Sequence, residues 1–135
     1  MFSCDQCLSG RHHTCRRLTF LGCPDQASGS LAEYIVIPET SCIKLPQHVS
    51  FDEATISEPL SIGLYAVKRA FPEKGMKTAI LGYGPIGMSV HLSLNSEGIT
   101  DSLVTDKIDN RLDKAAELGA DVVLIEDEKK ALDSL

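Results

Sequence analysis

The sequence predicts an α/β protein, the first half of a doubly wound parallel sheet, preceded by a loop-rich, partly β segment with a cysteine loop. Two patterns support this prediction. After residue 76, short apolar runs alternate with amphipathic stretches, as in strands joined by helices that cover a parallel sheet. Residues 1–30 are instead rich in Cys, Gly, Ser, Arg and His and lack a sustained apolar period. We therefore expect two domains, at residues 1–60 and 61–135.

Two strands are expected after the loop-like start. Residues 31–38, "LAEYIVIP", combine β-branched and aromatic side chains and end at a proline, which favours a strand. Residues 42–46, "CIKLP", predict a second, shorter strand. The stretch "PQHVSFDEA", at residues 46–54, is interpreted as a polar turn.

A helix is expected at residues 58–70, where Leu60, Leu64 and Val67 fall on one face of the helical period. Pro59 supports this prediction, because proline is favoured in the first turn of a helix.

The rest of the chain predicts a parallel sheet with its crossover helices. The apolar runs within the strands are short, as expected where both faces of a sheet are buried. The expected strands are residues 77–82, 102–106 and 121–125; the expected helices are residues 85–98 and 110–120, with the start of another in 126–135.

Composition limits the class of partner. The 135 residues, 43% of them apolar, are enough for a sizeable core, and the formal net charge is −6. An acidic chain is a poor match for nucleic acid or an anionic membrane surface, both of which attract basic faces. No apolar run has the length of a membrane span, and the start lacks the features of a signal peptide. We expect a cytoplasmic protein without a nucleic-acid or membrane partner.

The segment "LGYGPIG" carries Gly82, Gly84 and Gly87 in the G-x-G-x-x-G spacing, between an expected strand and an expected helix. The first glycine permits a tight turn, the second allows backbone to approach a pyrophosphate, and the third allows close packing of helix on strand. Unpaired N–H groups at the helix start then face the phosphates. Such glycines can also simply shape a turn, so the motif needs a second signal.

Asp106 supplies that signal. It ends the next expected strand, 24 residues after Gly82, where a carboxylate can accept hydrogen bonds from an adenosine ribose. Its charge would repel a 2′-phosphate, which favours NAD over NADP. Arg111, five residues further, can line the cofactor or lie solvated on the first turn of its helix; the residues alone do not decide between the two.

Three of the five cysteines, Cys4, Cys7 and Cys15, lie within twelve residues. An odd count and this clustering fit metal binding in a reducing compartment better than a disulfide framework. A closed structural zinc site needs four ligands, and the cluster offers three.

These segments together resemble the zinc-dependent medium-chain dehydrogenases, and within them the sorbitol (polyol) dehydrogenases. The resemblance rests on "CDQCLSGRHHTC", "GSLAEYIVIP", "KLPQHVSFDEATISEPLSIGLYAVKRA", "GYGPIG" and "TDKIDNRLDKAAELGAD". It implies the C-terminal part of a GroES-like catalytic domain followed by a partial Rossmann domain. It further implies zinc and NAD as cofactors, a polyol or alcohol substrate that yields a hydride to NAD, and a homo-oligomer in the full-length form.

The resemblance also implies roles for single residues. Glu58, in "SEPLS", matches the carboxylate that contacts the catalytic zinc directly or through water; its bland alternative is an acidic residue favoured at a helix start. Ile86, Asp106 and Arg111 match positions that contact NAD. Cys4, Cys7 and Cys15 match three of the four cysteines of the structural zinc lobe.

The family places a fourth lobe cysteine three residues before Cys4, at the position of Met1, and its catalytic cysteine and Gly-His-Glu motif further upstream. We therefore expect a fragment that is inactive alone as a polyol dehydrogenase. Two alternatives remain open: a non-catalytic nucleotide-binding module, and another medium-chain dehydrogenase such as a threonine dehydrogenase. A nucleic-acid zinc knuckle is disfavoured by the acidic charge.

Overall fold

The computed structural model describes residues 2–127, 129 and 133. The chain forms two compact units, residues 1–44 and residues 45–135, each of which is described by itself. Among the described residues, no helix is both long enough and apolar enough to cross a membrane.

The first unit consists mainly of turns. It contains the short helix α1, Asp5–Leu8, and the 3-10 helices His12–Thr14 and Glu39–Ser41. Arg16 holds α1 against the following loop, because its guanidinium donates to both carboxylate oxygens of Asp5 at 2.6 and 2.8 Å. The loop-like character expected for residues 1–30 is confirmed for the described residues 2–30, apart from the short helices above.

The prediction of two strands between residues 31 and 46 is wrong. Residues 31–38 and 42–46 form no ladder with any described residue. Leu31, Tyr34 and Val36 are 92–105% exposed. β-branched and aromatic side chains favour an extended backbone, but a strand is stable only when a neighbouring strand takes up its N–H and C=O groups and a face is buried.

The polar turn expected at residues 46–54 is confirmed only in its first half, where Gln47 and His48 form a turn and the Val49 N–H donates to the Pro46 carbonyl at 3.1 Å. A helix follows where the turn was expected to continue. Helix α2 spans Phe51–Thr55. Ser50 caps it: its hydroxyl accepts from the Glu53 N–H at 3.2 Å, and the Glu53 carboxylate accepts from the Ser50 N–H at 2.8 Å. This reciprocal capping box stabilises a first turn that has no apolar period.

Helix α3, Ser57–Ala70, confirms the helix expected at residues 58–70. It packs along α4, Pro85–Ser96, and belongs as a whole to the second unit, whereas the expected domain boundary at residue 60 divides it. The two helices approach most closely at Gly63, where a Cβ atom would overlap the backbone of Ser89. The absence of a side chain there sets the spacing of the helix pair.

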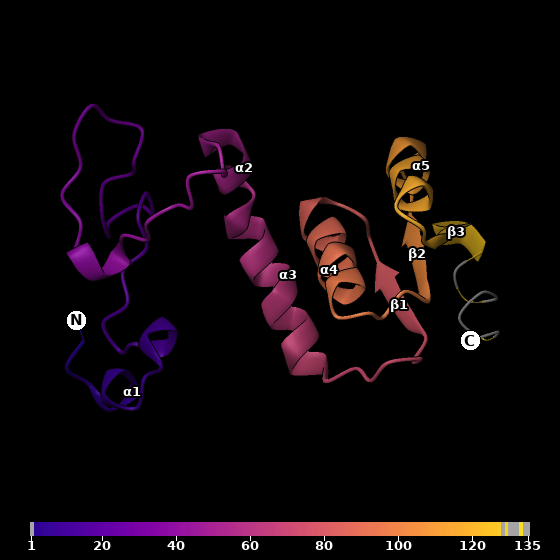
Figure 1. The fold of residues 1–135 in the computed structure, drawn as a ribbon, viewed down its shortest axis with the longest axis horizontal. Helices are drawn as coiled ribbons and strands as arrows, with labels where there is room; N and C mark the ends of the chain where they lie inside the picture. The colour runs from indigo at the N-terminus through magenta and orange to yellow at the C-terminus, as the bar shows by residue number, and fades with distance from the viewer. Residues whose placement is uncertain (1, 128, 130–132, 134–135) are drawn as a thin grey trace. The chain divides into compact units, whose positions relative to one another are not determined.

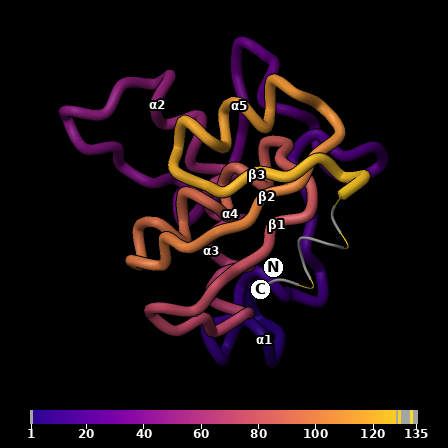
Figure 2. The backbone as a smooth tube through the Cα atoms, turned by 90° about the vertical axis from the view of Figure 1, so that its right-hand side faces the viewer, coloured from indigo at the N-terminus to yellow at the C-terminus, as the bar shows by residue number. Residues whose placement is uncertain are grey.

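A three-stranded parallel sheet follows in the order β1-β2-β3 (Figures 1 and 2). The strands are β1, Thr78–Leu81, β2, Ser102–Asp106, and β3, Asp121–Leu124, with α5, Asp109–Glu117, between the last two. The register pairs Ile80 with Val104 and Leu81 with Thr105. The expected alternation of strands and helices is thereby confirmed.

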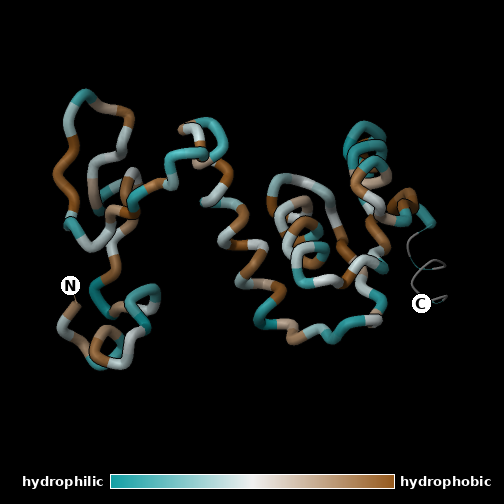
Figure 3. Tube along the Cα trace, viewed as in Figure 1, coloured by the Kyte–Doolittle hydropathy of each residue, from teal (hydrophilic) through white to brown (hydrophobic). Residues whose placement is uncertain are grey.

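The core of this unit lies between the sheet and its helices. Ile80 and Val104 pair across β1 and β2, and Leu94 of α4 and Leu112 of α5 belong to the same buried cluster. Apolar residues gather in the strands and α4, whereas α5 is largely hydrophilic (Figure 3). Because Leu94 and Leu112 share one buried cluster with Ile80, α4 and α5 cover the same face of the sheet. This is the arrangement that two successive right-handed crossovers give when the strand order is β1-β2-β3.

The helix start expected in residues 126–135 falls mostly outside the described residues. Within the described part, Ile125–Asp127 form a 3-10 turn, Lys129 is helical, and the Asp133 N–H donates to the Lys129 carbonyl at 3.0 Å.

Replacing Gly63 with alanine tests the helix contact. At an exposed helix position, replacing glycine with alanine stabilises the helix by about 1 kcal/mol. At Gly63 the added methyl group must displace the backbone of α4, so we expect the free energy of unfolding to fall by about 1–3 kcal/mol. Thermal unfolding measures the effect, and Arg69→Ala, at an exposed position of α3, is the control. A Gly63→Ala variant more stable than the parent would contradict the close approach.

Candidate functional site

A tight turn joins β1 to α4 and is built from the glycine motif. Gly82 has φ +96°, a left-handed conformation that side chains rarely adopt, and its N–H donates to the Thr105 carbonyl at 2.8 Å. Gly84 is the N-cap of α4 and Pro85 follows in the first turn. The turn thus leaves the sheet at the end of β1 and points the N–H groups of the helix start outward.

Gly87 allows α4 to lie directly on this turn. A Cβ atom at Gly87 would overlap the Gly82 carbonyl oxygen and approach Ile80 Cγ2 to 3.4 Å. The spacing of the three glycines therefore has a geometric cause: a turn with positive φ, a helix start, and a contact too close for a side chain.

Asp106 lies at the end of β2 beside the turn, with its side chain 4% exposed. Its Oδ2 accepts from the Tyr83 N–H at 2.7 Å, and its Oδ1 accepts from the Ile108 N–H at 3.0 Å. These bonds, the one from Tyr83 first, lower the pKa of Asp106 below its usual value. The carboxylate is therefore ionised at neutral pH despite its burial.

Arg111, in the first turn of α5, completes the cluster. Its Nη1 lies 3.3 Å from Asp106 Oδ2, and its side chain is 43% exposed. The guanidinium also faces Gly84, where a Cβ atom would lie 3.9 Å from Nη1. A partly exposed cation thus borders both the glycine turn and the buried carboxylate.

One cavity brings the expected cofactor residues together. It has a volume of about 510 Å³ and lies at the carboxyl ends of β1 and β2. Its lining includes all six residues expected to contact the cofactor: Gly82, Gly84, Ile86, Gly87, Asp106 and Arg111. Outward N–H groups and a helix dipole attract anions, and a carboxylate one strand away accepts from hydroxyls. The geometry suits a diphosphate attached to a sugar.

Glu58 is exposed in the first turn of α3, where an acidic side chain is favoured by the helix dipole. It is not among the residues that line the cavity of the glycine turn.

The three expected metal ligands converge in the first unit. Cys4 Sγ lies 3.6 Å from Cys7 Sγ and 3.9 Å from Cys15 Sγ. Tetrahedral zinc with Zn–S bonds near 2.3 Å separates its sulfurs by about 3.8 Å, so these thiols fit three corners of a zinc site. No other His, Cys, Asp or Glu within the described part of the chain joins the group. Met1, at the expected fourth position, lies outside the described residues.

The protonation of these thiols differs. A hydrogen bond from the backbone of Arg16, with a second from Cys7, lowers the pKa of Cys4 to about 6. Burial raises the pKa of Cys7. Cys4 is therefore more readily ionised than Cys7, and the thiolate is the form that binds a metal ion.

Sequence reasoning missed a buried polar network beneath the turn. Tyr83 is 1% exposed and His91 is fully buried, and the Tyr83 hydroxyl lies 2.8 Å from His91 Nδ1. Asn95 Nδ2 lies 3.3 Å from the other ring nitrogen. The available signal was a histidine and an asparagine four residues apart on an otherwise apolar helix face, which places both side chains together.

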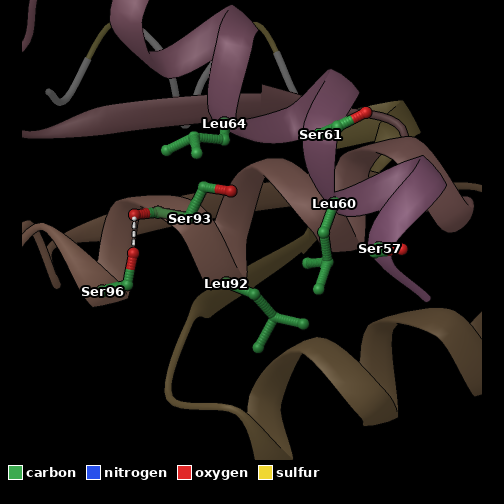
Figure 4. A pocket seen from close by; sticks show the side chains of 7 residues that line it. All are labelled: Ser57, Leu60, Ser61, Leu64, Leu92, Ser93 and Ser96. Carbon is green, nitrogen blue, oxygen red and sulfur yellow. Dashed lines mark hydrogen bonds between the residues drawn. The ribbon is translucent and has the colours of Figure 1, made fainter. Parts of the chain in front are cut away.

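A second cavity lies between α3 and α4 (Figure 4). It has a volume of about 500 Å³ and is lined by three leucines and four serines: Leu60, Leu64, Leu92, Ser57, Ser61, Ser93 and Ser96. Its lining carries no charged side chain.

Comparison with known proteins shows which proteins the chain is similar to. Residues 1–47 match the alcohol dehydrogenase GroES-like domain. L-idonate 5-dehydrogenase of Vitis vinifera is 38% identical over 90% of the chain, and sorbitol dehydrogenase of Homo sapiens is 37% identical over 87%. Over most of its length the chain is therefore similar to polyol dehydrogenases, and its first third is similar to an alcohol dehydrogenase domain. It spans about a third of the length of these curated relatives, 33% in both cases.

Solved structures agree with this relationship. An alcohol dehydrogenase of Escherichia coli CFT073, rspB, complexed with NADH, superposes with a TM-score of 0.88 at 28% identity. The match covers 100% of this chain and 41% of that one. The fold class is confirmed: part of a GroES-like domain, followed by the start of a Rossmann domain.

The acidity of Cys4 can be measured by alkylation of the metal-free protein. The rate of iodoacetamide labelling at Cys4 is expected to reach half its maximum near pH 6, because the thiolate is the reactive form. Peptide mass spectrometry reads the modification site by site, with the exposed Cys42 as internal control. A midpoint at Cys4 near the ordinary thiol pKa of 9.0 would contradict the arrangement.

Proposed function

We propose that residues 78–111 bind the adenosine diphosphate half of NAD. The observation that carries the proposal is the buried, ionised Asp106, hydrogen-bonded to the turn that would hold the pyrophosphate. Outward N–H groups at the start of α4 would receive the phosphates. Arg111 would lie at the edge of the nucleotide.

The acceptor capacity of Asp106 supports this role. A carboxylate has about four acceptor positions, and three of them face Tyr83 N–H, Ile108 N–H and Arg111 Nη1. The remaining position can accept a ribose hydroxyl. A 2′-phosphate at the same place would meet a fixed negative charge, which is why we propose NAD and not NADP as the cofactor.

For the whole protein we propose a dehydrogenase of polyols or other secondary alcohols, as the names of its relatives suggest. We propose zinc and NAD as its cofactors because of the cysteine cluster and the cavity at the glycine turn. A zinc ion, when bound, supplies Lewis acidity that favours the alkoxide form of an alcohol. In this chain Glu58 would orient the metal or its bound water, and Cys4, Cys7 and Cys15 would hold a structural zinc ion. The glycine turn, residues 82–87, called the nucleotide turn from here on, would bind the end of NAD that is remote from the nicotinamide.

Asp106→Asn tests the nucleotide site. The parent chain is expected to bind NAD at least about tenfold more tightly than NADP. The variant is expected to bind NAD roughly tenfold more weakly, because a charged hydrogen-bond acceptor is lost. Its discrimination between NAD and NADP is expected to narrow, because the repulsive charge is gone. Isothermal titration with both nucleotides measures these ratios.

Asp109→Asn is the matched control, since Asp109 is an exposed carboxylate in the first turn of α5. It removes the same charge without touching the turn and is expected to leave both affinities unchanged. Equal binding of NAD and NADP by the parent chain would contradict the proposed role of Asp106, and failure to bind either would refute the nucleotide site.

A further inference from the structure

The residue between the first two glycines of the turn has an unusual position. Tyr83 belongs to the buried core cluster by its ring, while its backbone N–H donates to Asp106 Oδ2 at 2.7 Å. The same residue therefore joins the turn, the carboxylate at the end of β2 and the interior of the unit.

The hydroxyl end of Tyr83 is fixed from within α4. It lies 2.8 Å from His91 Nδ1, and the two rings meet edge to face with centroids 5.8 Å apart. His91 is in turn 3.3 Å from Asn95 Nδ2. In the described chain no buried side-chain nitrogen or oxygen lacks a hydrogen-bond partner, so this network is fully satisfied.

Burying these polar side chains costs free energy, and filling the core does not require polar residues at these positions. An apolar residue at each of these positions would fill the core without requiring a hydrogen bond, and burial of a phenol and an imidazole is favourable only when both are paired. The hydrogen bond to His91 instead restricts the orientation of the Tyr83 side chain. It thereby restricts the orientation of the Tyr83 backbone N–H, which donates to Asp106.

We infer that Tyr83 and His91 are positioning residues for the nucleotide turn, which hold the Tyr83 backbone in the conformation that binds Asp106 and presents Gly84 to a pyrophosphate. This inference rests on the proposed function for its link to NAD. Neither side chain touches the nucleotide; both act through the backbone of the turn.

A neutral imidazole carries one N–H, so one ring nitrogen donates and the other accepts. If Asn95 Nδ2 donates to Nε2, then Nδ1 donates to the Tyr83 oxygen; with the Asn95 amide reversed, the Tyr83 hydroxyl donates instead. Either direction joins the same two atoms. An asparagine at position 91 places an amide atom, able to donate or accept, near the position of Nδ1, whereas a glutamine reaches toward Nε2.

This difference supplies the experiment, made on the full chain with four variants. Tyr83→Phe and His91→Gln break the bond, His91→Asn retains it, and Ile99→Val is a control that removes one methylene group from the same core. The first measurement is amide hydrogen exchange at residues 83 and 84 without nucleotide, and the second is the dissociation constant for NAD.

Tyr83→Phe and His91→Gln are expected to accelerate exchange at both amides and to weaken NAD roughly tenfold, about the effect of one buried hydrogen bond. His91→Asn and Ile99→Val are expected to match the parent in both measurements. Rescue by asparagine separates a positioning role from a general loss of stability.

Unchanged exchange or unchanged NAD affinity in Tyr83→Phe would overturn the inference, and so would equal effects of Tyr83→Phe and Ile99→Val. If the parent chain does not bind NAD but the exchange pattern is as expected, the proposed function fails while the ordering of the turn by this pair is supported.

Discussion

The hydrogen bond from the Tyr83 N–H to Asp106 Oδ2 connects the nucleotide turn, which joins β1 to α4, to the end of β2. The carboxylate is almost fully buried, and it stays ionised because backbone N–H groups and Arg111 surround it. Its pKa is lower in the folded than in the unfolded chain. It therefore stabilises the fold at neutral pH, and this contribution is lost as the pH falls through the pKa of the folded state.

Two contacts made by glycine determine where the helices around this bond can lie. Gly63 lets α3 approach the backbone of α4 near Ser89, and Gly87 lets α4 rest on the Gly82 carbonyl. Because α4 is held on both sides, its N-terminal N–H groups point to the cavity at the end of β1. Tyr83 and His91 add a third restraint from the core. The nucleotide turn is thus held by packing and polar contacts together.

Much of this arrangement could be predicted from the sequence because its determinants are local. The strand expected at residues 102–106 coincides with β2, and the glycine spacing located the turn. The strands expected at residues 31–38 and 42–46 failed because strand formation depends on a partner that propensity does not supply. Helix α2 was missed because its start depends on the reciprocal hydrogen bonds of Ser50 and Glu53 and not on apolar periodicity.

Some contacts of the candidate site could likewise be predicted from the sequence, and others could not. Asp106 and Arg111 are positioned by the ends of regular elements, so their spacing in the sequence indicated their meeting. The hydrogen bond between Tyr83 and His91 depends on the direction in which the Tyr83 side chain points, which sequence spacing does not specify. His91 lies within reach of the Tyr83 hydroxyl only because α4 packs on the turn.

A buried, ionised Asp106 anchors the nucleotide turn. Carbon-13 NMR of the Asp106 carboxyl group, followed as a function of pH in the chain without nucleotide, measures this directly. We expect a pKa of Asp106 below that of an ordinary aspartate and a Tyr83 amide signal that titrates with it. An ordinary or raised pKa for Asp106, with a Tyr83 amide signal indifferent to it, would contradict the account.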